Sequence, residues 1–219
     1  NLNPDEIYDQ VILMSQQSKY YFNRPLSNIV FMGMGEPLLN YNNVLTAIRK
    51  INKLEGLGIS SRRITLSTSG IPKMIKKMAD ENVKFRLAVS LHSARQSLRE
   101  KIMPFAKKFP LEELLDSLQH WHLKTRKKVT FEYVIWEGIN DKKADINALV
   151  NFCKMIPSKV NLIQYNSIEN SSMKEASEES INLYVDALNN AKIKVTYRRS
   201  RGQDIDAACG QLANKIDLA

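Results

Sequence analysis

Residues 64–90 read ITLSTSGIPKMIKKMADENVKFRLAVS, and their pattern decides the fold class. The apolar stretch 64–67 predicts a buried strand, residues 71–82 carry apolar side chains at helical spacing, and residues 85–90 predict a second buried strand. A strand, a helix and a strand of these lengths form a β-α-β unit, in which the two strands run parallel. The same alternation continues on both sides, so the chain is predicted to be an α/β protein with a parallel sheet.

The remaining predicted elements extend this alternation towards both ends of the chain. Further strands are expected at 28–32, 129–136, 160–165 and 194–199, and further helices at 44–54, 111–124, 142–155 and 178–191. We find no repeat and no linker in the sequence, and we therefore interpret residues 1–219 as one domain.

A first helix is expected to begin at Asn3–Glu6. An Asn cap, a proline at the first helical position and a glutamate at the third mark this start. Ile7, Val11 and Met14 then fall on one predicted apolar face. Because no strand precedes this helix, we expect that a strand and its loop belong upstream, and that the strand at 28–32 has an unpaired edge prone to association or disorder.

The composition favours an anionic partner. Lys and Arg number 32 against 23 Asp and Glu, which gives a formal net charge of +9. Nucleic acid is the leading candidate, and a soluble enzyme with a basic surface is the alternative. The sequence has no apolar stretch that suggests a membrane span. The two cysteines, Cys153 and Cys209, exclude a disulfide scaffold and favour a cytosolic compartment; Cys153 is expected to be buried in a helix.

Polar and glycine residues follow several predicted strands, at the edge where parallel α/β proteins build their active sites. Residues 33–37 (GMGEP) offer backbone groups to an amino-acid ligand, although a simple tight turn is the alternative. Residues 67–70, 90–93 and 166–167 are hydroxyl or amide clusters, each of which is also typical of a helix cap. His92 alone is typical of a structural histidine, and His120 and His122 are interpreted as packing or surface residues. No histidine has metal-ligand spacing, so we expect no protein metal site in this chain.

Cys209 lies in RGQDIDAACGQL, residues 201–212. Its neighbours Ala208 and Gly210 are small, which leaves the thiol accessible for chemistry, and a small filler residue in a tail helix is the alternative. Arg198, Arg199 and Arg201 lie close by in sequence and are expected to contact phosphate.

Five motifs in order resemble one family, the radical SAM adenine-C2 RNA methyltransferases of the RlmN type. They are GMGEPLLNYNNV (33–44), RRITLSTSG (62–70), LAVSLHS (87–93), the strand leading to Asn166, and RGQDIDAACGQLA (201–213). The resemblance implies a partial (β/α)6 TIM-like radical SAM barrel, truncated at its N-terminus so that the first strand and the cluster loop are absent. It implies S-adenosylmethionine (SAM) and a 4Fe-4S cluster as cofactors.

The resemblance also implies roles for individual residues. The residues that match SAM contacts of the family are Gly35, Glu36, Ser67, Ser90, Leu91, His92 and Asn166. Cys209 matches the cysteine that takes a methyl group from one SAM and becomes S-methylcysteine. A 5′-deoxyadenosyl radical from a second SAM then activates that methyl group, which adds to adenine C2 in 23S rRNA or tRNA. A thiolate is needed because the C2 carbon is electrophilic and cannot attack SAM itself, and the adenine must leave its stack to react.

This sequence departs from the family in the cysteines that it lacks. The family binds its cluster with a C-x-x-x-C-x-x-C loop, which is absent here, and a resolving cysteine is absent as well. We therefore expect the chain alone to bind no cluster and to be inactive. Two other hypotheses stay open: a Cfr-type enzyme that methylates adenine C8, and a non-catalytic RNA-binding homologue.

Overall fold

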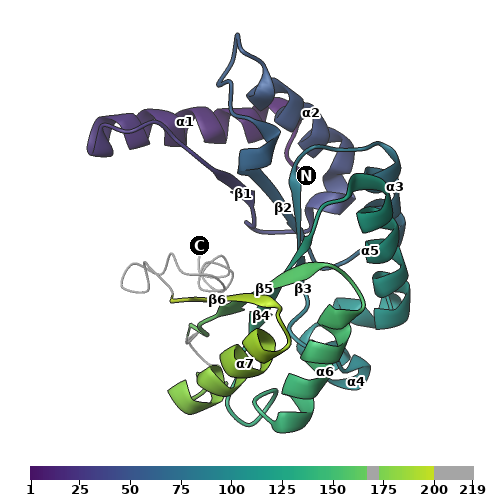
Figure 1. The fold of residues 1–219 in the computed structure, drawn as a ribbon. Helices are drawn as coiled ribbons and strands as arrows, with labels where there is room; N and C mark the ends of the chain where they lie inside the picture. The colour runs from purple at the N-terminus through teal and green to yellow at the C-terminus, as the bar shows by residue number, and fades with distance from the viewer. Residues whose placement is uncertain (167–172, 200–219) are drawn as a thin grey trace, which may run out of the picture. The chain divides into compact units, whose positions relative to one another are not determined.

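The computed structural model describes residues 1–166 and 173–199 (Figure 1). Its six strands form one sheet in the order β1-β2-β3-β4-β5-β6. The pairs β1–β2, β4–β5 and β5–β6 are parallel. Helices alternate with these strands along the chain, so the predicted parallel α/β fold is confirmed.

The chain divides into two compact units. The first holds residues 1–68 and 81–88, and the second holds residues 69–80 and those from 89 onward. The elements of the first unit are α1 (Pro4–Phe22), β1 (Ile29–Phe31), η1 (Pro37–Asn40), α2 (Tyr41–Asn52), η2 (Ser61–Arg63) and β2 (Ile64–Thr68). Strand β3 (Arg86–Ser90) begins in the first unit and ends in the second.

The second unit contains the later elements. They are α3 (Pro72–Asp80), α4 (Gln96–Ile102), η3 (Pro104–Lys108), α5 (Leu111–Thr125), β4 (Val129–Val134), α6 (Lys143–Lys154), β5 (Ser158–Ile163), α7 (Glu178–Asn190) and β6 (Lys194–Arg198). All six predicted strands are therefore present, with ends displaced by no more than a few residues.

The predicted start of α1 is confirmed in detail. The Asn3 side chain accepts hydrogen bonds from the backbone N–H groups of Asp5 (2.9 Å) and Glu6 (3.0 Å), and the Glu6 carboxylate accepts one from the Asn3 N–H (2.7 Å). These reciprocal bonds satisfy donors that the first helical turn leaves without partners.

The predicted apolar face of α1 is right only for its first half. Ile7 and Val11 are buried where α1 lies beside α2, but the side chain of Met14 is 56% exposed. The second half of α1 extends past α2 (Figure 1), and Tyr20, Tyr21 and Phe22 at its end are also exposed. Helical spacing identifies the face that Met14 shares with Ile7 and Val11, but not the length over which a neighbour covers that face.

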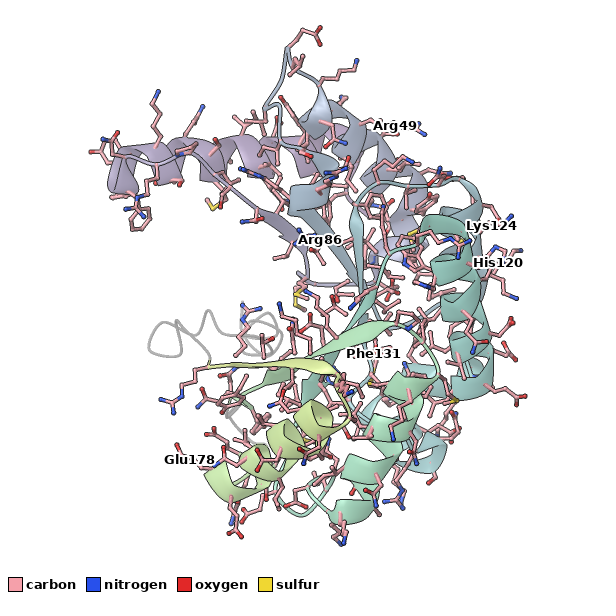
Figure 2. All side chains as sticks on the ribbon, in the orientation of Figure 1. Arg49, Arg86, His120, Lys124, Phe131 and Glu178 are labelled. Carbon is pink, nitrogen blue, oxygen red and sulfur yellow. The ribbon has the colours of Figure 1, made fainter. Side chains whose placement is uncertain are left out.

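The core of the second unit lies between helices and strands of the same unit. Helix α3 packs on α5, with Trp121 and Leu118 fully buried between them and their neighbours. Phe131 of β4, labelled in Figure 2, is fully buried and packs edge-on against Phe152 of α6. Burial of large apolar side chains of this kind supplies most of the stabilising free energy of a fold.

Strand β1 lies at one edge of the sheet, as expected. Its middle residue, Val30, is more than half exposed. Association through this edge stays a prediction. Among the described helices, none combines the length and the apolar character that a membrane span requires.

The capping bonds of α1 give a first test. Replacing Asn3 with Ala should lower the free energy of unfolding by about 1 kcal/mol, because the first-turn N–H groups lose their acceptor. Gln16→Ala, a change at an exposed position of the same helix, is the matched control and should have little effect. Urea denaturation followed by circular dichroism measures both, and equal changes in the two variants would contradict the capping role.

Candidate active site

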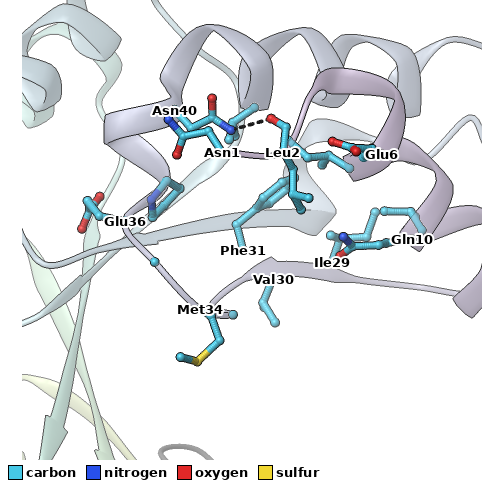
Figure 3. A pocket seen from close by; sticks show the side chains of 16 residues that line it. Asn1, Leu2, Glu6, Gln10, Ile29, Val30, Phe31, Met34, Glu36 and Asn40 are labelled. Atoms are coloured by element: carbon cyan, nitrogen blue, oxygen red, sulfur yellow. Dashed lines mark hydrogen bonds between the residues drawn. The ribbon is translucent and has the colours of Figure 1, made fainter. Parts of the chain in front are cut away.

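The turn after β1 has an open backbone. A Cβ atom built on Gly33 or Gly35 would meet no other atom within 4 Å, and Gly35 has a φ of +87°, a conformation that favours glycine. A ligand can therefore approach the main chain of this turn closely. The turn borders a cleft of about 820 Å³ that lies entirely in the first unit, between α1, β1, η1 and α2 (Figure 3).

Glu36 is fixed at the end of this turn. Its Oε1 atom accepts hydrogen bonds from the Leu38 N–H (3.0 Å) and from the hydroxyl of Thr68 (2.8 Å). The first bond caps η1, and the second joins the turn to the end of β2. Ser67, the predicted SAM contact beside Thr68, is buried. The first unit therefore brings together Gly35, Glu36 and the end of the strand that carries Ser67.

The turn after β3, in the second unit, is closed rather than open. The N–H groups of Leu91 (3.0 Å) and His92 (3.4 Å) both donate to the backbone oxygen of Glu132 on β4. Leu91 is fully buried, and His92 adopts a φ of +54°, which a residue other than glycine seldom does. Such a conformation persists only where its surroundings hold it.

The ring of His92 is neutral and has a defined tautomer. The N–H of Val134 donates to Nδ1 at 3.1 Å, so Nδ1 is the unprotonated nitrogen and the ring proton lies on Nε2. Burial, with a smaller contribution from the positive charge of Arg99, lowers the pKa of His92 to about 4. At neutral pH, His92 is therefore a hydrogen-bond donor through Nε2 and is not a proton shuttle.

Arg99 lies buried beneath the same turn. Its guanidinium donates to the backbone oxygens of Ser69 (2.6 Å), Leu91 (3.3 Å) and Ser90 (3.5 Å). Burial lowers the pKa of Arg99 to about 10, so it keeps its charge at neutral pH. One buried cation thus holds the ends of two successive chain segments in the second unit.

Glu132 and Asn161 form a polar row on one face of β4, β5 and β6. The Asn161 amide donates to the Glu132 carboxyl (3.0 Å), and the Thr196 hydroxyl donates to the Asn161 oxygen (2.5 Å). Burial raises the pKa of Glu132 above its ordinary value, against the opposing effect of the bond from Asn161. This row was not predicted, because its members are separated by about 30 residues and are marked only by polar positions within apolar strands.

The remaining predicted residues are found in several environments. Asn166 follows β5 and is buried. Arg198 and Arg199 are exposed at the end of β6, where Arg199 forms an ion pair with Glu178 at 3.6 Å. Arg201 and Cys209 lie outside the described residues.

The predictions for the other cysteine and histidines are confirmed. Cys153 is buried in α6, and burial raises the pKa of its thiol to about 12. His120, labelled in Figure 2, is hydrogen-bonded to the Asp80 carboxylate at 2.7 Å, and His122 bonds the backbone oxygen of Lys127. Both are surface or packing residues, as expected.

Residues 3–152 match the radical SAM superfamily. The chain belongs to this superfamily. It is 64% identical over 215 residues to the probable dual-specificity RNA methyltransferase RlmN of Flavobacterium johnsoniae, and it covers 62% of that protein. A protein of the same name from Salinibacter ruber is 45% identical over 217 residues, of which this chain covers 59%. In both cases the match takes in 98% of this chain, which therefore spans about three fifths of these relatives.

Solved structures agree with this relationship. The crystal structure of a radical SAM methyltransferase from Sphaerobacter thermophilus has a TM-score of 0.93 and 37% identity, with 96% of this chain and 62% of that one covered. Streptococcus suis SuiB bound to S-adenosylmethionine has a TM-score of 0.64 at 13% identity, covering 100% of this chain and 47% of SuiB, which shows likeness of fold alone. The resemblance and the fold class expected from the sequence are confirmed.

The depressed pKa of His92 predicts a loss of stability in acid. Folding lowers this pKa from about 6.5 to about 4, so below pH 6.5 the unfolded chain binds the proton more tightly. The free energy of unfolding should fall as the pH drops from 6.5 to 4, by up to about 3 kcal/mol from this residue alone. Urea denaturation at pH 7, 5.5 and 4 should show this loss in the native chain and not in His92→Gln.

His122→Gln is the matched control for this series and should follow the native chain at every pH. If the curves of the native chain and of His92→Gln run parallel between pH 7 and 4, the assignment of a neutral His92 with a lowered pKa is wrong.

Proposed function

We propose that this chain is the SAM-binding and methyl-carrying part of an RNA methyltransferase that acts on adenine C2 in 23S rRNA and tRNA. The observation that carries the proposal is the 64% identity, over 98% of the chain, with a relative named as a dual-specificity RNA methyltransferase. The net charge of +9 agrees with an RNA substrate.

The chemistry of the two turns suits the parts of SAM. The open turn at Gly33 and Gly35 gives the amino-acid portion access to backbone groups, and the fixed Glu36 carboxylate favours its ammonium group. Ser67 offers a hydroxyl at the end of β2. In the second unit, His92 offers an Nε2–H donor, and Ser90, Leu91 and Asn166 complete the proposed contacts.

Cys209 is the proposed methyl acceptor. Its thiolate attacks the SAM methyl carbon, a carbon–sulfur bond forms, and the bond from that carbon to the sulfonium breaks to release S-adenosylhomocysteine. Cys153, the other cysteine, is buried with a pKa raised to about 12, so it supplies no thiolate at neutral pH. Arg198, Arg199 and Arg201 are proposed to bind phosphates of the RNA.

Superfamily membership implies a 4Fe-4S cluster, which supplies the radical chemistry of such enzymes. A C-x-x-x-C-x-x-C loop needs three cysteines, whereas these 219 residues contain two. The residues present do not fit the cluster by themselves, and the chain alone is proposed to be inactive. Reconstitution of the chain with iron and sulfide should give no 4Fe-4S absorbance band, and a stable band would contradict this.

The proposed role of Cys209 is tested on the full product of the gene, isolated from the cells that produce it, because the chain alone is proposed to be inactive. Peptide mass spectrometry should find the Cys209 peptide heavier by one methylene group, and the Cys153 peptide, an internal control in the same digest, unmodified. An unmodified Cys209, or equal modification of both cysteines, would exclude the methyl-carrier role.

The position of methylation on the base is tested separately. Nucleoside mass spectrometry of RNA from cells with and without the intact gene should show that 2-methyladenosine depends on it. Loss of 8-methyladenosine instead would support the Cfr-type alternative, and no change in either nucleoside would support a non-catalytic RNA-binding protein.

A further inference from the structure

The loop after β4 returns sharply to Asn140, whose side chain is fully buried. Its amide nitrogen donates to the backbone oxygens of His92 (2.9 Å) and Val134 (2.8 Å), and its amide oxygen accepts from the Trp136 N–H (2.8 Å). Both amide hydrogens therefore form hydrogen bonds, each to a different backbone oxygen. An aspartate has the same shape but no hydrogen to donate, and an alanine can form none of these bonds.

One of these bonds goes to His92 directly, and a second goes to Val134, which itself bonds the His92 ring. His92 is held at three points: its N–H bonds Glu132, its ring accepts from Val134, and its backbone oxygen accepts from Asn140. Asn140 also holds the backbone oxygen of Val134, the residue whose N–H fixes the ring. One side chain therefore positions both the backbone of His92 and the donor that selects its tautomer.

We propose that Asn140 is a positioning residue for His92, holding its left-handed backbone and the tautomer that presents Nε2–H to SAM. The part that concerns SAM rests on the proposed function. Asn140 itself touches no reacting atom in this proposal, since its three side-chain bonds all go to backbone groups.

Loss of the Asn140 side-chain amide should have specific consequences for His92. Without it, the positive φ of His92 loses a restraint, the turn relaxes, and the Val134 N–H no longer aligns with Nδ1. The proton can then occupy either ring nitrogen, and a ring that moves towards water regains a pKa closer to 6.5. The Nε2–H donor is no longer held in place, so SAM binding weakens.

Tyr184 provides a matched control. Its hydroxyl donates to the backbone oxygen of Asn140 at 2.5 Å and is buried in the same region. Tyr184→Phe therefore removes a buried hydrogen bond to the same residue without touching the Asn140 amide. A purely structural role for Asn140 predicts that the two variants behave alike.

The experiment records the ring nitrogen NMR signals of the full chain, labelled with ¹⁵N-histidine, from pH 4 to 8. His92→Gln assigns the signals. In the native chain, His92 should be protonated on Nε2 alone at neutral pH. In Asn140→Ala, its pKa should rise by about one unit or more and both tautomers should appear, whereas Tyr184→Phe should resemble the native chain.

Calorimetric titration with SAM provides the second readout. Asn140→Ala should bind SAM about tenfold more weakly than the native chain, which corresponds to the loss of one well-placed hydrogen bond, and Tyr184→Phe should bind within about twofold of it. Asn140→Asp, which keeps the shape but not the donors, should weaken binding at least as much as Asn140→Ala.

The outcomes separate this proposal from the proposed function. If the native chain binds no SAM while the NMR signals change as expected, the positioning role stands and the proposed SAM site fails. A folded Asn140→Ala with native His92 tautomer and pKa overturns the positioning role. If neither Asn140 variant folds, the native chain still decides, because a native His92 protonated on Nδ1 contradicts the geometry on which the role depends.

Discussion

The need to satisfy buried carbonyl oxygens at the end of β3 is the constraint on which the candidate site depends. Where a parallel strand ends, its backbone groups lose their partners in the sheet, and burial without new partners is costly. Arg99 donates to the oxygens of Ser90 and Leu91, and Asn140 donates to that of His92. Because side chains carry these bonds, the turn can bend away from the sheet with these backbone oxygens still satisfied.

The two candidate turns each contain a residue with a positive φ, but they accommodate it in different ways. Gly35 reaches its positive φ because it has no Cβ, and the turn around it stays open to solvent. His92 has a positive φ although it carries a side chain. Hydrogen bonds to its N–H, its ring and its backbone oxygen offset the energetic cost of this conformation. The turn at Gly35 leaves backbone groups open to a ligand, whereas the turn at His92 holds a side chain in a fixed position.

The sequence was sufficient for features that depend on local order. The capping box at Asn3 joins residues three positions apart, and the strands are marked by apolar runs, so both were predicted. Arg99 and Asn140 were missed because their partners are backbone oxygens, which every residue possesses and no sequence pattern marks. The Asn140–His92 bond spans 48 positions. The exposure of Met14 has a related origin, since it depends on how far α2 extends beside α1.

The contrast between the two cysteines adds a physical argument to the resemblance. Methyl transfer from a sulfonium requires a thiolate, and a thiol with a pKa near 12 supplies almost none at neutral pH. Burial in α6 raises the pKa of the Cys153 thiol, and the opposing effect of the Ser158 side chain offsets burial only in part. If this chain carries a methyl group on sulfur through a thiolate, Cys209 is the cysteine of the two that remains for the role.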